Sequence, residues 1–141
     1  MLLINGGRKT ILVVEDHEGV RELTRLILEN EGYTVLVAGN GTEAMSCAEQ
    51  HRDPIPLIVT DALMPGMSLP ELTQRMKALN PECLILVISG HPNEVIASRR
   101  FDEDGHAFLQ KPFAPDRLVT IVRDMLASTS GALTSRTASA S

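Results

Sequence analysis

Five short apolar runs divide the chain into alternating strand-like and helix-like segments. The runs are TILVV (10–14), TVLVA (34–38), PLIVT (56–60), LILVI (84–88) and AFL (107–109). Each run is almost continuously apolar instead of alternating with polar residues, which is typical of strands that are buried on both faces of a parallel sheet. The pattern therefore predicts five parallel strands with helices on both sides.

The segments between these runs have the apolar spacing and the start signals of helices. We expect helices over 17–30, from Asn40 or Thr42 to about Gln50, from Ser68 to the NPE at 80–82, over 92–100, and from Pro115 onward. Ser68 and Glu71 form a capping box, which marks a helix start. Alternation of five strands and five helices predicts an α/β fold of the flavodoxin-like (βα)5 type, with strand order 2-1-3-4-5.

Composition limits the domain organisation and the class of protein. A chain of 141 residues with 43% hydrophobic residues fits one domain. We expect an N-terminal extension over 1–8, the domain over 9–127, and a disordered Ser/Ala/Thr-rich tail or linker stub over 128–141. The net charge of −5 without a dense basic tract argues against nucleic acid as a partner, and no run is long enough to span a membrane. Two cysteines without metal or disulfide spacing, Cys47 and Cys83, indicate a reducing, cytoplasmic setting.

Polar side chains stand at the carboxyl ends of four predicted strands. They are Glu15 and Asp16 after the first, Asp61 after the third, Ser89 after the fourth and Lys111 after the fifth. Chemistry in open parallel sheets gathers at this edge, and the predicted order makes these four strands neighbours. Three close carboxylates repel one another unless a cation such as Mg2+ neutralises them. A carboxylate nucleophile acting on phosphorus fits this set, with Ser89 and Lys111 binding phosphoryl oxygens.

The stretches ILVVEDHEGVREL, VTDALMPGM, LVISG and FLQKPF, in this order, resemble the receiver domain of bacterial two-component response regulators. The resemblance covers about 9–127. It implies that Asp61 accepts a phosphoryl group from the phosphohistidine of a histidine kinase or histidine phosphotransfer domain. It also implies that Glu15 and Asp16 hold Mg2+, joined by Asp61 and the backbone carbonyl of Leu63. The resemblance implies a signalling domain that is not an enzyme and catalyses only its own phosphorylation and dephosphorylation.

The resemblance further implies a switch at the same edge. Ser89 and Lys111 would bind the phosphoryl group, and Phe108 would follow Ser89 when the domain is phosphorylated. A cis peptide bond would precede Pro112. The surface of the predicted fourth helix, fifth strand and fifth helix would then change, and the face of these two helices is also a candidate for homodimer contact.

Two further positions concern the lifetime of the phosphorylated state. Leu63 and His91 match the variable positions that flank the phosphoryl group in the family. An apolar Leu63 cannot orient an attacking water, which predicts slow self-dephosphorylation, and His91 would partly offset this effect.

Alternatives stay open on the sequence alone. GNGTEA (39–44) matches G-x-G-x-x-A between a strand and a helix, so Gly39, Gly41 and Asp61 could belong to a dinucleotide-binding domain. A receiver-like binding module that is never phosphorylated is the other alternative. The sequence is compatible both with a stand-alone regulator and with a fragment of a hybrid sensor kinase, which SGH (89–91) and FLQKPF favour.

Overall fold

The structure, a computed structural model, describes residues 9–62, 66–90 and 107–130. Its strands are β1 (Thr10–Val14), β2 (Thr34–Ala38), β3 (Leu57–Asp61), β4 (Leu84–Ser89) and β5 (Ala107–Gln110). Its helices are α2 (Glu18–Asn30), α3 (Gly41–Gln50), α4 (Leu69–Leu79) and α7 (Pro115–Ser130). All five predicted strands are confirmed to within one residue at each end. The helix predicted over 92–100 lies outside the described residues, and α7 includes the first three residues of the predicted tail.

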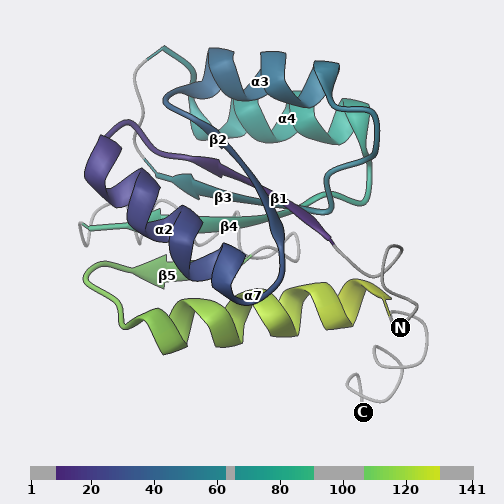
Figure 1. Cartoon of the computed structure of the whole chain (residues 1–141). Helices are drawn as coiled ribbons and strands as arrows, with labels where there is room; N and C mark the ends of the chain where they lie inside the picture. Colours follow the sequence, from purple (N-terminus) through teal and green to yellow (C-terminus); the bar gives the residue numbers. More distant parts are fainter. Residues whose placement is uncertain (1–8, 63–65, 91–106, 131–141) are drawn as a thin grey trace.

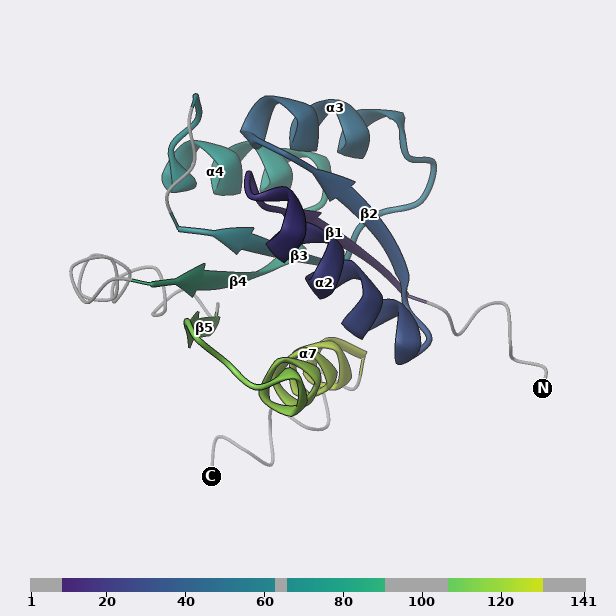
Figure 2. The same cartoon turned by 60° about the vertical axis from the view of Figure 1, so that its left-hand side comes forward.

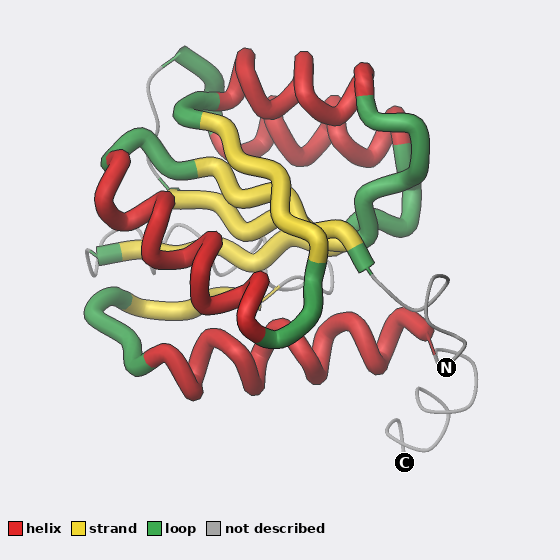
Figure 3. The backbone as a smooth tube through the Cα atoms, viewed as in Figure 1, coloured by secondary structure: helices red, strands yellow, loops and turns green. Residues whose placement is uncertain are grey.

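The five strands form one parallel sheet of order β2-β1-β3-β4-β5, as predicted for a flavodoxin-like fold. Helices α3 and α4 cover one face of the sheet, and α2 and α7 cover the other (Figures 1 and 2). Because every strand runs in the same direction, as the arrows in Figure 1 show, all the carboxyl ends meet at one edge. At this edge, loops lead from β1, β2 and β5 into α2, α3 and α7 (Figure 3).

Two apolar clusters, one on each face of the sheet, explain the continuous apolar runs. Successive residues of a strand point to opposite faces, so Leu12 and Val14 pack toward α3 and α4 while Ile11 and Val13 pack toward α2 and α7. All four side chains are almost completely buried. A strand that is covered on both faces has no solvent-facing position for a polar residue before its end.

Side-chain caps begin three of the described helices. His17 caps α2, Asn40 caps α3 and Ser68 caps α4, each accepting a hydrogen bond from a backbone N–H three residues later. The Ser68–Glu71 start signal is therefore confirmed at the amide of Glu71. His17 at the α2 cap leaves the carboxylate of the preceding Asp16 outside the helix start. Among the described helices, none combines the length and the apolar character needed to cross a membrane.

Candidate functional site

Strand register brings the predicted polar residues together at the carboxyl edge of the sheet. Val14 of β1 pairs with Thr60 of β3, so the next residues, Glu15 and Asp61, lie side by side. On the other side of β3, Asp61 pairs with Ile88 of β4. The residue after Ile88 is Ser89, so the register also places Ser89 at this edge.

Three carboxylates converge at this edge. Glu15, Asp16 and Asp61 each offer an oxygen within 4.8 Å of the other two. Glu15 is buried, Asp61 is partly buried, and Asp16 is exposed to solvent. Hard divalent cations such as Mg2+ bind sets of carboxylate oxygens and keep several waters, and a cluster with one exposed member leaves room for them. The residues present fit such an ion.

Lys111 is the cation that the structure places at this cluster. Its Nζ lies 3.5 Å from Oε1 of Glu15 and 3.7 Å from Oδ2 of Asp61. Its backbone N–H donates to the carbonyl of Ser89 over 2.7 Å, which ties the end of β5 to β4. The lysine thus faces both carboxylates from the end of β5, at the same edge of the sheet, as the sequence predicted.

The carboxyl group of Asp61 is destabilised in its ionised form. Burial, and after it the negative charge of Glu15, raise the pKa of Asp61 from 3.8 to about 6. The charge of Lys111 and the N–H of Ala62 act in the opposite direction without cancelling the effect. One lysine therefore does not balance the three carboxylates, and a bound divalent cation would restore the ionised Asp61.

Glu15 is fixed by hydrogen bonds at its amide, carboxylate and carbonyl groups. Its N–H donates to the carbonyl of Ala38 over 3.0 Å. Its Oε2 accepts from the backbone N–H of His17 over 3.1 Å, and its carbonyl oxygen accepts from Nη1 of Arg21 over 2.9 Å. Sequence reasoning missed Arg21, because one arginine on a helix carries no signal of what it contacts.

The remaining predicted site residues differ in how much the structure says of them. Ser89 is completely buried. Phe108 pairs with Val87 and packs, half-buried, against the apolar cluster beneath α3 and α4. The peptide bond between Lys111 and Pro112 is cis. Leu63 and His91 lie outside the described residues.

Close packing explains the two glycines of GNGTEA without a nucleotide. A Cβ on Gly41 would lie only 2.6 Å from the Cβ of Met67, a buried residue that follows β3. A Cβ on Gly39 would lie 3.3 Å from Nη1 of Arg21 and 3.2 Å from Oε1 of Glu43. Both glycines are therefore covered by other side chains, so a pyrophosphate could not approach them closely.

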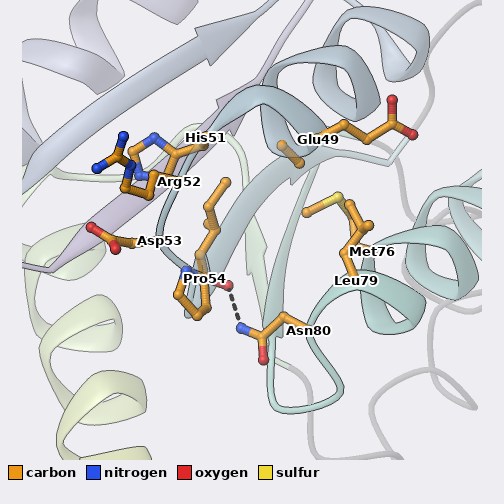
Figure 4. A pocket seen from close by; sticks show the side chains of 10 residues that line it. Glu49, His51, Arg52, Asp53, Pro54, Met76, Leu79 and Asn80 are labelled. Atoms are coloured by element: carbon orange, nitrogen blue, oxygen red, sulfur yellow. Dashed lines mark hydrogen bonds between the residues drawn. The ribbon is translucent and has the colours of Figure 1, made fainter.

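A pocket of about 220 Å³ lies at the opposite edge of the sheet, near the amino ends of β3 and β4 (Figure 4). It is lined by the ends of α3 and α4 and by the loop before β3, with Asn80 donating to the carbonyl of Ile55. The Nε2 atom of His51 is buried there without a hydrogen-bond partner among the residues that the structure describes. None of the strand-end carboxylates lines this pocket, so it is separate from the candidate site.

Comparison with known proteins gives a consistent family. Residues 11–123 match the family model of the response regulator receiver domain. The chain is 32% identical over 120 residues to the sensor kinase CckA of Brucella abortus, covering 85% of this chain and 13% of the kinase. It is 30% identical to the transcriptional regulator DctD of Rhizobium meliloti, covering 81% of this chain and 24% of that protein. The chain thus spans only a small part of these relatives.

Solved structures agree with these sequence matches. The receiver domain of the hybrid histidine kinase CckA superposes with a TM-score of 0.70 at 32% identity, covering 83% of this chain and 98% of that domain. A CheY-like receiver domain protein from Methanospirillum hungatei superposes with a TM-score of 0.76 at 26% identity, covering 88% and 98%. Each match therefore covers nearly the whole of the comparison domain.

Proposed function

The chain belongs to the response regulator receiver domain family of two-component signalling, and from this premise we propose that Asp61 is its phosphoacceptor. This membership replaces the dinucleotide-binding alternative. One observation carries the proposal: the carboxylate of Asp61 lies at the open edge of the sheet within 3.7 Å of Nζ of Lys111. A nucleophile on phosphorus needs such a cation to balance the charge of the phosphoryl oxygens.

In the proposed reaction an Oδ atom of Asp61 attacks the phosphorus of a phosphohistidine. The O–P bond forms as the N–P bond breaks, and the electron pair of that bond stays on the imidazole of the donor. Lys111 offsets charge on the phosphoryl oxygens, and Ser89 binds one of them. These roles are supported by the position of Ser89 at the end of β4, next to β3, and by that of Lys111 directly after β5, the strand beyond β4.

Glu15, Asp16 and Asp61 are the residues that would hold Mg2+, with the carbonyl of Leu63 as a further proposed ligand. When bound, the ion would supply positive charge next to the accepting carboxylate and the incoming phosphoryl oxygens. The convergence of the three carboxylates within 4.8 Å supports this assignment. The raised pKa of Asp61 supports it independently, because such a group gains most from a nearby cation.

A histidine kinase or histidine phosphotransfer domain is the proposed donor, and α2 supplies a surface for it. Helix α2 begins at Glu18, directly after the carboxylate pair, so a donor that reaches Asp61 also covers its first turns. Leu23 and Leu26 on this helix are 57% and 53% exposed. Exposed apolar side chains next to a reaction site are typical of protein contacts. We therefore propose that the donor packs on Leu23 and Leu26.

The output side of the proposal concerns β5 and α7. Phosphorylation would draw Ser89 inward, and Phe108 would follow by a change in packing, since phenylalanine has no hydroxyl group. The altered surface of β5 and α7 would bind the downstream partner or a second copy of the domain. The helix predicted over 92–100, expected to share this role, lies outside the described residues. Two free thiols, Cys47 and Cys83, support a reducing compartment such as the cytoplasm.

Intact-mass measurement tests the phosphoacceptor directly. The protein is incubated with acetyl phosphate and Mg2+, and one phosphoryl group is expected on the wild type and none after addition of EDTA. The variant Asp61→Asn should carry no phosphoryl group, while Asp124→Asn, an exposed carboxylate on α7, should be labelled like the wild type. Labelling that persists in Asp61→Asn would overturn the assignment. An unlabelled wild type would instead favour the non-phosphorylated binding module.

A further inference from the structure

The guanidinium group of Arg21 reaches from α2 to the loop that carries the acidic pair. Its Nη1 donates to the carbonyl oxygen of Glu15 over 2.9 Å. This carbonyl belongs to the peptide group that joins Glu15 to Asp16. Because a peptide group is planar and rigid, a bond to its oxygen fixes the plane from which both acidic residues project.

The turn between β2 and α3 surrounds the same guanidinium. The N–H of Gly39 donates to Oε1 of Glu43 over 2.7 Å, which holds this carboxylate over the turn. Nη1 of Arg21 and Oε1 of Glu43 both lie just over 3 Å from the position that a Cβ of Gly39 would take. The guanidinium group of Arg21 therefore fits in this position because Gly39 has no side chain that would crowd it.

A backbone hydrogen bond also connects the segment after β1 to the end of β2, close to Arg21. The N–H of Glu15 donates to the carbonyl of Ala38, the residue before Gly39. The backbone of Glu15 is thus held on one side by the end of β2 and on the other by Arg21. Only the bond from Arg21 comes from a side chain, so it can be removed by substitution without changing the strand.

We propose that Arg21 is a positioning residue of the carboxylate site, which orients Glu15 and Asp16 for the divalent cation without contacting it. The inference rests on the proposed function, because it concerns the same cation site. Mutation of a residue that orients a metal ligand lowers metal affinity about ten- to a hundredfold. Arg21 acts on the backbone between two ligands, so a loss near the lower end of this range, about tenfold, is expected.

The sign of the effect separates positioning from simple electrostatics. A cation near three carboxylates repels an incoming Mg2+, so removing its charge should strengthen Mg2+ binding if charge were its only influence. Removing a residue that orients the ligands should weaken binding instead. The two roles therefore predict opposite changes for Arg21→Ala.

The test compares Mg2+ affinities of the unphosphorylated full chain. Mn2+ serves as the probe ion because it shares the preference for carboxylate ligands, and its bound fraction is read from water-proton relaxation while Mg2+ competes. Arg21→Ala should weaken Mg2+ binding about tenfold, and Arg21→Lys, which keeps the charge and a donor, should recover part of the loss. Arg25→Ala is the matched control, because Arg25 lies on the same helix but, within the described part of the chain, its side chain bonds to Glu22 and Glu29 alone.

Several outcomes would overturn the inference. If Arg21→Ala binds Mg2+ as tightly as the wild type, or more tightly, Arg21 has no positioning role. This holds even if the midpoint of thermal unfolding falls in the variant. If Arg21→Ala does not fold, Gly39→Ala displaces the guanidinium while keeping its charge, and unchanged Mg2+ binding in this variant overturns the inference as well. A wild type that does not bind Mg2+ overturns the proposed cation site and the inference together, whereas a loss in Arg21→Ala that Arg25→Ala does not show supports both.

Discussion

Replacing Asp61 with asparagine should stabilise the metal-free protein, and more strongly as the pH rises. The ionised carboxylate is disfavoured by burial and by Glu15, which raises the pKa of Asp61 to about 6. An asparagine has a similar shape and never ionises, so it does not incur this cost. The folded state of the wild type should therefore lose stability, relative to Asp61→Asn, as Asp61 becomes ionised.

The two pKa values give the magnitude and the pH window. The pKa is 3.8 in the unfolded chain and about 6 in the folded one, so the folded state binds the proton more tightly. The contribution of the protonated Asp61 carboxyl group to the free energy of unfolding is fully present below pH 3.8 and is lost as the pH rises through 6. The whole shift corresponds to about 3 kcal/mol, and linkage gives about 1 kcal/mol of it between pH 5 and pH 8.

Urea unfolding at pH 5 and pH 8 in the presence of EDTA measures this change. Far-UV circular dichroism is the suitable signal, because the chain has one tyrosine and no tryptophan. The stability advantage of Asp61→Asn over the wild type should be about 1 kcal/mol larger at pH 8 than at pH 5. Saturating Mg2+ at pH 8 should stabilise the wild type and reduce this advantage, because the ion binds the ionised carboxylates of the folded state.

Asp124→Asn on α7 is the matched control, since it removes one exposed carboxylate that does not belong to the cluster. Its stability difference from the wild type should change little over the same pH range. If Asp61→Asn and the wild type kept a constant difference between pH 5 and pH 8, the raised pKa of Asp61 and the crowding of the three carboxylates would be refuted.

The remaining predictions concern packing, capping and the lifetime of the phosphate. Gly41→Ala places a Cβ 2.6 Å from the Cβ of Met67 and should lower the free energy of unfolding in urea by about 1–3 kcal/mol. The double variant with Met67→Ala should lose less free energy of unfolding than the two single variants together, and strict additivity would argue against the contact. Ser68→Ala removes the acceptor of the Glu71 amide and should lower the free energy of unfolding by about 1 kcal/mol; an unchanged urea midpoint would contradict the capping bond. Leu63→Asn should accelerate decay of the aspartyl phosphate, followed by intact mass, because an amide can orient water; unchanged or slower decay would contradict this.

Much of this fold and its site could be predicted from the sequence, because the relevant signals lie within single strands or directly after them. A strand covered on both faces must be apolar throughout, so each strand was visible as a run of residues such as LILVI. A charge that directly follows such a run, as Asp61 does, has to lie where the strand leaves the core. Since parallel strands share one carboxyl edge, the polar residues after four runs could be expected together.

The tertiary structure alone decided what each of these residues contacts. Arg21 reaches the carbonyl of Glu15, and Met67 covers Gly41, because strand register and helix placement bring separate loops together. Neither contact has a sequence period, so no pattern of apolar spacing predicts it. The pKa of Asp61 likewise depends on burial and on the distance to Glu15. The sequence by itself thus determined which groups stand at the edge, and the tertiary structure determined their orientation and ionisation, because both depend on distances between chain segments.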